Sequence, residues 1–400
     1  MANNNKHTGP NVPALRFPEF SGEWKKRGLS EYLQFKNGLN PDAKRFGDGI
    51  KFISVMDILN NAFISYDLIR ASVSATEKEI EDFAVENGDV LFQRSSETLE
   101  DVGRSNIYID TRKCVFGGFV IRGKKTGEYE PYFMKYRLDS PNARKSIIVK
   151  GAGAQHFNIS QDGLSQVELC FPELAEQTKI GSLLKTIDEC IDTQSKIIEE
   201  LTTLRSALIE KCSKQSGALF DLSDILQEVD ERSTVANQYQ VLSSTVKGIF
   251  YQKEYFNKDL ASEDNKGYKV VRRGHVVLSP QNLWMGNINY NDRFDIGIVS
   301  PSYKVYSIRD GFNPIFITSL LRTKKALYEY MLASEQGASI VRRNLNVEAF
   351  MVIKFRIPDS RQQDSLSIAI NAINAKLNNE RTILERLTMQ KYSLLENMFI

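Results

Sequence analysis

The sequence predicts an α+β protein in which two mixed α/β bodies are separated by two long helices that form an antiparallel coiled coil. Three observations predict this fold: an internal repeat with pseudo-twofold character, two long heptad patterns, and short strand-like segments between glycine-containing turns. The expected segments are 1–172 for the first body, 173–213 for the first helix, 214–358 for the second body and 359–400 for the second helix.

Composition indicates a globular chain. Of the 400 residues, 42% are hydrophobic and 26% are charged, which excludes disordered, collagen-like and disulfide-scaffold classes. No apolar run approaches the roughly 18 residues needed to span a bilayer. The first residues also lack the apolar core of a signal peptide. We therefore expect a cytoplasmic location and no membrane partner. The four cysteines form no Cys-x-x-Cys pair and there are only three histidines, which argues against a metal site.

The two halves of the chain repeat one pattern. Placing Phe171-Pro172 on Ile357-Pro358 gives an offset of 186, the difference between 358 and 172. With this offset Glu176-Gln177 falls on Gln362-Gln363, and the apolar positions that follow also match. Upstream the match is weaker and needs small gaps. This pattern is expected when one part of each half is a shared scaffold and the other part is variable.

The shared part of each half is predicted to be a long helix. Between Glu173 and Ser213 there is no proline, and apolar residues recur at alternating steps of four and three. The repeating positions are Ile180, Leu184, Ile187, Ile191, Gln194, Ile198, Leu201, Arg205, Leu208 and Cys212 in the first helix, and Leu366, Ile370, Ile373, Leu377, Glu380, Leu384, Leu387, Lys391, Leu394 and Met398 in the second. Polar residues interrupt both series at the same two places.

These polar interruptions predict how the helices align. In an antiparallel pair the numbers of facing residues add to a constant, and a constant of 585 places Arg205 opposite Glu380 and Gln194 opposite Lys391. A shift of one heptad would set charged residues against apolar ones, at a cost on the order of several kcal/mol. We therefore predict this register, with the polar pairs acting as a register key. The alternative is that each apolar stripe packs only on its own half.

Both bodies are predicted to mix strands and helices. Strand-like segments are residues 50–55, 89–92, 119–121, 269–271 and 303–306, and helical segments are 75–86 and 314–332. Each body is long enough to form its own core.

Positive charge gathers in corresponding stretches of the two bodies. Ser140 to Gln161 and Gln336 to Val347 contain no acidic residue but several basic ones, and further basic runs are Lys124-Lys125, Arg272-Arg273 and Arg322 to Lys325. Cations beside Gln, Asn and Ser side chains suit DNA, because cations contact phosphates while amide and guanidinium groups read base edges. A solvated charged surface is the alternative for each run, since the whole chain is nearly neutral, with 52 basic and 50 acidic residues.

Three near-motifs do not support catalysis. Gly118 to Lys125 resembles a phosphate-binding loop, but Lys125 stands where the magnesium-binding Ser or Thr must be. Asn313 to Phe316 is one residue away from the Asn-Pro-Pro-Phe loop of amino-methyltransferases, yet no glycine-rich cofactor loop accompanies it. The histidines lie in no recognisable Ser or Cys nucleophile context. We therefore expect that the chain is not an enzyme and binds no cofactor itself.

Two motifs resemble a known family. Val12 to Trp24 (VPALRFPEFSGEW) is similar to a common opening of the DNA-specificity subunits of type I restriction-modification enzymes. Phe171 to Gly181 (FPELAEQTKIG), followed by the heptad pattern, resembles the first conserved helix of that family. The second copy departs from the pattern, with Gln362 in the place of Glu176. In plan, the resemblance covers the whole chain.

The resemblance implies a division of labour. Such subunits have two target-recognition domains, which each read half of a bipartite double-stranded DNA target and are held apart by two conserved helices. Two methyltransferase subunits use S-adenosylmethionine, and two restriction subunits use ATP and Mg²⁺ to cleave unmodified DNA. A helix from Ile180 to Cys212 would span about 50 Å at roughly 1.5 Å per residue, enough to separate two half-sites. A coiled-coil interaction scaffold that binds no DNA, a self-sufficient enzyme and a methylation-only system are the alternatives.

Candidate DNA-facing residues follow from charge, loop context and repeat position. They are Arg94, Ser95, Arg104, Arg144, Lys150, Gln155, His156 and Asn158 in the first body, and Gln281, Asn282, Trp284, Arg342, Arg343 and Asn344 in the second. The target sequence itself has no simple residue-to-base code to be read from the chain.

Overall fold

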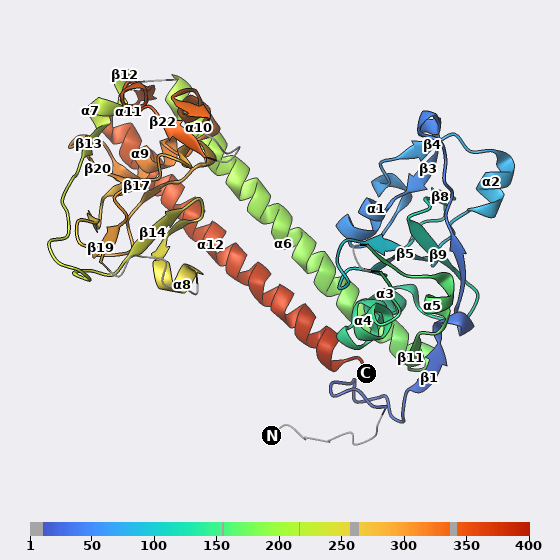
Figure 1. Ribbon diagram of the computed structural model, residues 1–400. Coiled ribbons are helices and arrows are strands. Elements are labelled where there is room, and N and C mark those ends of the chain that lie inside the picture. The colour runs from blue at the N-terminus through green and yellow to red at the C-terminus, as the bar shows by residue number, and fades with distance from the viewer. Residues whose placement is uncertain (1–10, 154–155, 216, 257–263, 337–341) are drawn as a thin grey trace. The chain divides into compact units, whose positions relative to one another are not determined.

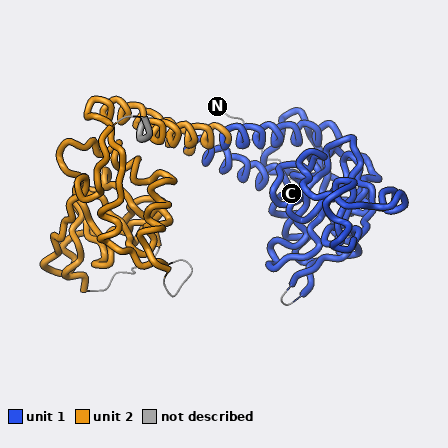
Figure 2. The backbone as a smooth tube through the Cα atoms, turned by 90° about the horizontal axis from the view of Figure 1, so that it is seen from above, with its two compact units in different colours: residues 1–195, 382–400 blue, residues 196–381 orange. Residues whose placement is uncertain are grey.

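The computed structural model describes residues 11–153, 156–215, 217–256, 264–336 and 342–400 (Figure 1). The chain forms two compact units, residues 1–195 with 382–400 (unit 1) and residues 196–381 (unit 2), coloured separately in Figure 2. The two longest helices, α6 (Leu174–Gln215) and α12 (Ser360–Asn397), each contribute to both units.

Unit 1 contains an antiparallel sheet with the strand order β2-β9-β5-β7, and β1 pairs with β11. Besides its parts of the long helices, its elements are β1 (Lys25–Gly28), η1 (Leu29–Glu31), β2 (Leu33–Asn37), η2 (Ala43–Arg45), β3 (Phe46–Ile53), α1 (Val55–Asn60), η3 (Tyr66–Leu68), β4 (Ser72–Val73), α2 (Glu77–Asp82), β5 (Val90–Gln93), β6 (Ser95–Ser96), β7 (Ser105–Ile107), β8 (Val115–Phe116), β9 (Val120–Lys125), α3 (Pro131–Asp139), α4 (Pro141–Ile148), β10 (Phe157–Asn158), α5 (Gln161–Ser165) and β11 (Glu168–Phe171).

Unit 2 contains an antiparallel sheet with the strand order β13-β20-β17-β18, and β12 pairs with β23. Its elements are β12 (Ala218–Asp221), α7 (Leu222–Ile225), β13 (Leu226–Glu228), β14 (Leu242–Thr245), β15 (Gly248–Tyr251), α8 (Gln252–Phe256), β16 (Lys269–Arg272), β17 (Val276–Leu278), η4 (Leu283–Met285), β18 (Ile288–Tyr290), β19 (Ile296–Val299), β20 (Lys304–Ile308), α9 (Pro314–Leu320), α10 (Lys324–Leu332), β21 (Ser334–Gln336), β22 (Arg343–Leu345), α11 (Val347–Met351) and β23 (Lys354–Ile357).

The two sheets follow the same path through the chain. In each four-stranded sheet, the strand that comes first in the chain (β2 or β13) pairs with the strand that comes last (β9 or β20). The second strand in the chain (β5 or β17) also pairs with that last strand. The offset of 186 that relates the two halves of the sequence also relates the elements at the end of each body. It carries α5 onto α11, β11 onto β23 and the first residue of α6 onto that of α12. The α+β fold and its repeated plan therefore agree with the sequence prediction.

Each unit has its own core, to which both long helices contribute. In unit 1 the start of α6, with Ile180 and Leu184, packs with Met398 and Phe399 at the end of the chain. In unit 2 the opposite ends meet, and Ile209 of α6 shares a cluster with Ile370 of α12. The two helices therefore pack antiparallel within each unit.

The opening motif packs on the start of α6. The buried Glu176 carboxylate accepts hydrogen bonds from Arg16 Nε at 2.8 Å and Nη2 at 2.7 Å, and from Trp24 Nε1 at 3.4 Å. The ion pair and the indole contact satisfy a charge that would be costly to bury alone. This contact explains why the two motifs that carry the family resemblance occur together in one chain.

Polar pairs between α6 and α12 fix their alignment. Lys391 Nζ lies 2.6 Å from Asp188 Oδ1 in unit 1. In unit 2, Arg205 Nη1 donates to Asn374 Oδ1 at 3.0 Å. The residue numbers of both pairs add to 579, and the offset of 186 carries Asp188 onto Asn374 and Arg205 onto Lys391.

Arg205 and Lys391 thus contact other residues than Glu380 and Gln194, which the predicted register places opposite them. The register itself stays a prediction. That prediction assumed that a seam cation needs a polar residue directly opposite. Long basic side chains can instead lie along an apolar neighbour and place the charge beyond it, and here they reach residues that flank the seam. Glu380 forms an ion pair with Lys376 of its own helix.

The predicted elements differ from the observed ones mainly at their ends. The predicted helix 75–86 is the single capped helix α2, where Thr76 Oγ1 accepts a hydrogen bond from Glu79 N at 3.2 Å. The predicted helix 314–332 is divided into α9 and α10, because Thr323 caps a new helix by accepting from Ala326 N at 3.3 Å. The four-segment division of the chain into recognition domains and spacer helices stays a prediction.

Candidate nucleic-acid interface

In unit 1 the pairing of β6 with β10 gathers several candidate residues at one place. Ser95 and Asn158 are directly paired, and Ser95 Oγ donates to Asn158 Oδ1 at 2.5 Å. The main-chain carbonyl of Arg94 accepts from Ile159 N at 3.0 Å. The carbonyl of the exposed His156 accepts from Asn158 Nδ2 at 3.3 Å. We call the group Arg94, Ser95, His156 and Asn158 the first rim.

Other candidates of the first body are engaged within the protein. Arg144 donates to the carbonyl oxygens of Gly103 at 2.8 Å, Glu100 at 2.9 Å and Val102 at 2.7 Å. Burial, together with the nearby charge of Arg104, lowers the pKa of Arg144. Its guanidinium therefore holds the turn at 100–103 rather than facing a ligand, so Arg144 positions a loop.

Two further cations of the first body have partners close by in the chain. Arg104 Nε lies 2.6 Å from Asp101 Oδ1, and both side chains are about half exposed. Lys150 Nζ donates to Gln166 Oε1 at 3.2 Å. Exposed pairs of this kind are weak, so these cations can exchange partners for a phosphate. Gln155 lies outside the described residues.

In unit 2 a backbone hydrogen bond joins two candidate segments. Arg343 N donates to the carbonyl of Gln281 at 3.1 Å, which ties the start of β22 to the loop before η4. Asn344 is exposed and is paired with Glu335 of β21. Gln281 is exposed as well. We call the group Gln281, Trp284, Arg342 and Asn344 the second rim; Trp284 is half-buried and Arg342 exposed.

Two candidates of the second body are turned toward the protein. Arg343 donates from Nε to Ser334 Oγ at 3.0 Å and from Nη2 to the Ser334 carbonyl at 2.9 Å, so its guanidinium holds the β21–β22 hairpin together. Asn282 Oδ1 is buried without a hydrogen-bond partner among the described residues. Neither side chain is therefore directed at an external ligand in this structure.

The two rims correspond through the repeat. The offset of 186 carries Ser95 onto Gln281 and Asn158 onto Asn344, and in both units main-chain contacts join the two segments concerned. Asn158, Gln281 and Asn344 are exposed and Ser95 is half-buried. Amide and hydroxyl groups at such positions are suited to contact base edges. The sequence prediction thus selects residues that the fold brings together, and their contact with DNA stays a prediction.

The basic run Arg272-Arg273 is neutralised by carboxylates. Arg272 pairs with Glu231 at 2.7 Å and Arg273 with Asp295 at 2.9 Å. These two arginines link neighbouring turns and offer less positive potential than the sequence indicates.

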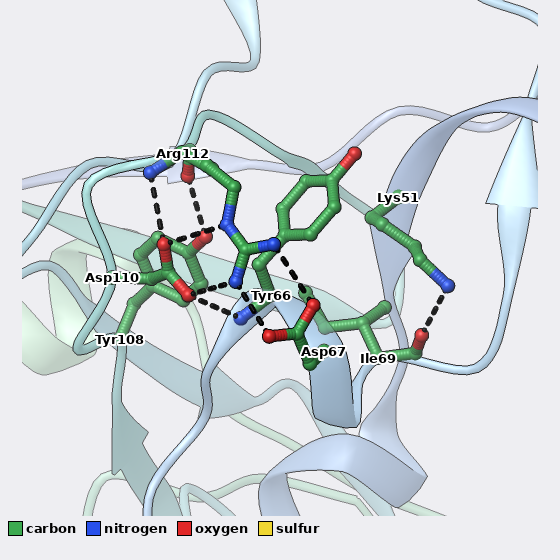
Figure 3. A network of polar contacts seen from close by, with 7 residues as sticks. All are labelled: Lys51, Tyr66, Asp67, Ile69, Tyr108, Asp110 and Arg112. Carbon is green, nitrogen blue, oxygen red and sulfur yellow. Dashed lines mark hydrogen bonds and ion pairs between the residues drawn. The ribbon is translucent and has the colours of Figure 1, made fainter.

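Arg112 is an exposed arginine of unit 1 that several contacts hold in place. Figure 3 shows its guanidinium between the carboxylates of Asp67 and Asp110, at 2.8 and 2.9 Å, with the ring of Tyr66 against it. Tyr108 Oη donates to the Arg112 carbonyl at 2.5 Å. The hydrogen bonds from Arg112 hold the pKa of Asp110 well below its usual range. This network orders a loop and leaves little unpaired charge.

Among the residues that the structure describes, no group of three or more His, Cys, Asp and Glu side chains is placed to hold a metal ion. In the same part of the chain, every helix is too short or too polar to cross a membrane.

The fold and the rims define a class of protein, in which a duplicated α/β body is carried on two long helices and exposes polar groups at repeat-related positions. Residues 21–203 match the family model of the type I restriction modification DNA specificity domain. The resemblance seen in the two motifs is thereby confirmed.

Individual relatives agree with this family. The specificity subunit of the EcoKI type I restriction enzyme from Escherichia coli K12 is 24% identical over 178 residues, which cover 43% of this chain and 38% of the relative. The matched region thus spans well under half the length of that relative. The crystal structure of a type I S subunit from M. genitalium has a TM-score of 0.57 at 15% identity, covering 97% of this chain and 99% of that chain.

A second solved structure, of a type I restriction-modification system studied for its complex assembly and conformational transition, has a TM-score of 0.53. It is 12% identical and covers 93% of this chain and 96% of that chain. At these identities the structural likeness establishes the fold, and the α+β architecture extends over nearly the whole chain.

Proposed function

We propose that this chain is the specificity subunit of a type I restriction-modification complex and reads a bipartite DNA target, one half-site with each body. The observation that carries the proposal is the recurrence of the rims. Polar side chains stand at repeat-related positions, the half-buried Ser95 and exposed Asn158 in one body and the exposed Gln281 and Asn344 in the other. The four-stranded sheets of the two bodies have the same pairing pattern. A duplicated reading surface suits a target made of two separate halves.

The sequences of the two rims differ while their backbones correspond. Ser95 in the first body is matched by Gln281 in the second, whereas Asn158 is matched by Asn344. Side chains of different length and hydrogen-bonding capacity read different base patterns. The two half-sites are therefore expected to differ, which makes the target asymmetric.

In this proposal the chain recognises the DNA target, and its partner subunits catalyse methylation and cleavage. Two methyltransferase subunits would bind S-adenosylmethionine, and two restriction subunits would bind ATP and Mg²⁺. This chain would dock both kinds of subunit and bind double-stranded DNA in the cytoplasm without a cofactor of its own.

The experiment that tests the proposal is DNA binding by the full chain assembled with its methyltransferase partner. Affinity for a duplex library should fall steeply as salt rises, because each phosphate contact adds about −0.9 to the slope of log K against log salt. A bound fraction enriched in one split motif would support the proposal. An intact complex without salt-dependent DNA binding would favour the coiled-coil interaction scaffold instead.

A further inference from the structure

A polar cavity of about 1150 Å³ lies within unit 2, between the long helices and the body. Parts of α6 and α12 form one wall, and the β14–β15 turn, the end of β18 and the α9–α10 junction form the others. Its lining includes the cations Arg205, Lys247, Arg293, Arg322 and Arg381. Among the described residues that line it, Asp292 is the only carboxylate. The cavity therefore has a strong excess of positive charge.

Three of the arginines are close enough to repel one another. Burial and the neighbouring charge of Arg381 lower the pKa of Arg205. Burial and the charge of Arg205 lower the pKa of Arg322 in turn. A guanidinium nonetheless stays protonated at neutral pH. Like charges gathered in this way cost free energy in the absence of an anion.

Neutral amide and carbonyl groups hold two of these arginines in place. Arg322 donates from Nη1 to Asn289 Oδ1 and from Nη2 to the Val246 carbonyl, both at 2.9 Å. Arg205 donates to Asn374 Oδ1 at 3.0 Å. An amide oxygen fixes the direction of a guanidinium without cancelling its charge. The positions of the cations are thus set by the fold, and their charge is left for a ligand.

The corresponding place in unit 1 is filled and neutral. There, Lys391 and Asp188 stand where the repeat has Arg205 and Asn374, and their charges compensate one another at 2.6 Å. The ring of Tyr136 is buried in the same place, with its hydroxyl donating to Asp188 Oδ2 at 2.7 Å and Lys391 Nζ 5.6 Å from its centre. Asn374 occupies in the second copy the position that Asp188 has in the first, so only the second copy lacks this internal counter-ion.

We propose that the cavity of unit 2 binds a phosphate group of the DNA backbone, an inference that rests on the DNA-specificity function proposed above. Guanidinium groups pair with phosphate oxygens through parallel hydrogen bonds, and asparagine amides add further donors. The mostly polar lining suits an oxyanion better than an apolar molecule. Because the internal counter-ion is missing only in unit 2, the proposed phosphate contact is specific to that half of the chain, although the fold is duplicated.

The test restores the counter-ion. Asn374→Asp places a carboxylate beside Arg205, as Asp188 lies beside Lys391, and is compatible with the fold because the first copy already has this pair. Arg381→Gln removes an exposed cation from the same cavity. Arg361→Gln is the matched control, since Arg361 is exposed on the same helix but is not part of the lining. All are compared in the full chain assembled with its methyltransferase partner.

The expected result is a smaller salt slope in the first two variants. Loss of one phosphate contact should reduce the slope by about 0.9 and weaken binding roughly fivefold at 0.15 M salt. Arg361→Gln should bind like the wild type. If the wild-type complex binds DNA and all three variants match it, the cavity proposal is overturned while the proposed function stands.

A second arm distinguishes a free anion from the DNA backbone. Thermal unfolding of the full chain is followed with inorganic phosphate and with chloride at equal ionic strength. If phosphate stabilises the wild type but not Asn374→Asp, and DNA binding is the same in both, the cavity binds a free phosphate and the DNA assignment is wrong. If the wild-type complex shows no salt-dependent DNA binding at all, the proposed function fails and this proposal falls with it.

Discussion

Gln177 and Gln363, which lie 186 residues apart, make the same two hydrogen bonds in the two halves of the chain. Gln177 donates to the Pro172 carbonyl at 3.0 Å and accepts from Glu130 N at 3.1 Å. Gln363 donates to the Pro358 carbonyl at 2.9 Å and accepts from Asn313 N at 2.8 Å. Each buried glutamine thereby ties the start of a long helix to the residue that caps α3 or α9.

Removing either glutamine should loosen the junction of one body with its helix. Gln177→Ala and Gln363→Ala each remove a buried hydrogen bond to a proline carbonyl and leave a partly buried N–H group without its acceptor. Each should therefore reduce the free energy of unfolding by about 1–3 kcal/mol. Urea unfolding followed by circular dichroism measures this change. Arg361→Ala, at an exposed position two residues from Gln363, should change it by less than about 0.5 kcal/mol. Equal losses in all three variants would contradict the assigned role.

The same junction explains the glycine in α6. A Cβ at Gly181 would lie 2.3 Å from Glu130 Oε2 and 2.8 Å from Phe133 N, so α3 can approach only because the side chain is absent. At the matching position of α12, Ser367 Oγ donates to Asn313 Oδ1 at 2.6 Å. The longer cap residue, Glu130, thus faces a glycine in α6, and the shorter cap residue, Asn313, faces a serine in α12.

This size relationship predicts that Gly181→Ser is destabilising, although glycine usually weakens a helix interior. The expected loss is about 1–3 kcal/mol from overpacking. Adding Glu130→Asn, which reproduces the second copy and removes the contact with Glu130 Oε2, should recover part of it. Thermal unfolding of the single and double variants provides the measurement, and a double variant no more stable than Gly181→Ser would show that the two sites are not coupled.

Arg144 and Asn344 should behave differently when they are replaced. Arg144→Ala removes three hydrogen bonds to the turn at 100–103 and should lower stability and weaken DNA binding without changing target preference. Asn344→Ala removes an exposed amide of the second rim and should relax one base position, at a cost of about 1–3 kcal/mol in discrimination. Sequencing of DNA selected by each assembled variant separates the two effects. A relaxed base position with Arg144→Ala would show that this residue reads DNA.

The carboxylate network around Arg112 predicts a pH dependence. Hydrogen bonds from Arg112 lower the pKa of Asp110 in the folded state, so the folded chain favours the ionised carboxylate. This stabilisation is complete above the unfolded pKa of about 4 and is lost as the pH falls through the lower folded value. The melting temperatures of the wild type and Asp110→Asn should therefore differ at pH 7 and converge below pH 4. A constant difference across this range would exclude the linkage.

Periodicity and the repeat predict the parts of the fold that depend on backbone pattern. The offset between Pro172 and Pro358 locates α11 and β23 from α5 and β11, and the proline-free heptads locate both long helices. The contacts of individual side chains cannot be predicted from these patterns. The sequence does not show that the Arg144 guanidinium donates its hydrogen bonds to carbonyl groups, because the turn that it contacts is about forty residues away in the chain. The contact of Arg205 with Asn374 could not be predicted for a related reason, since the reach of its long side chain decides which residue it contacts.

The cavity of unit 2 illustrates the same limit. Arg322 belongs to a basic run that is visible in the sequence, but Arg381 and Asn289 are not marked by any motif. Only the fold brings these residues together. The one signal in the sequence is the replacement of Asp188 by Asn374 between repeat copies, which has meaning only once the pair with Arg205 is known.

The most direct test of DNA-target recognition is a map of the adenines that the assembled complex methylates. The chain is co-expressed with the methyltransferase subunit encoded beside it, and N6-methyladenine is located across the host genome by long-read sequencing. The proposed function predicts one split, asymmetric motif with a methylated adenine in each half, and Asn344→Ala should relax only one half. An intact, correctly assembled complex that leaves the genome unmethylated, or that methylates an undivided motif, would contradict it.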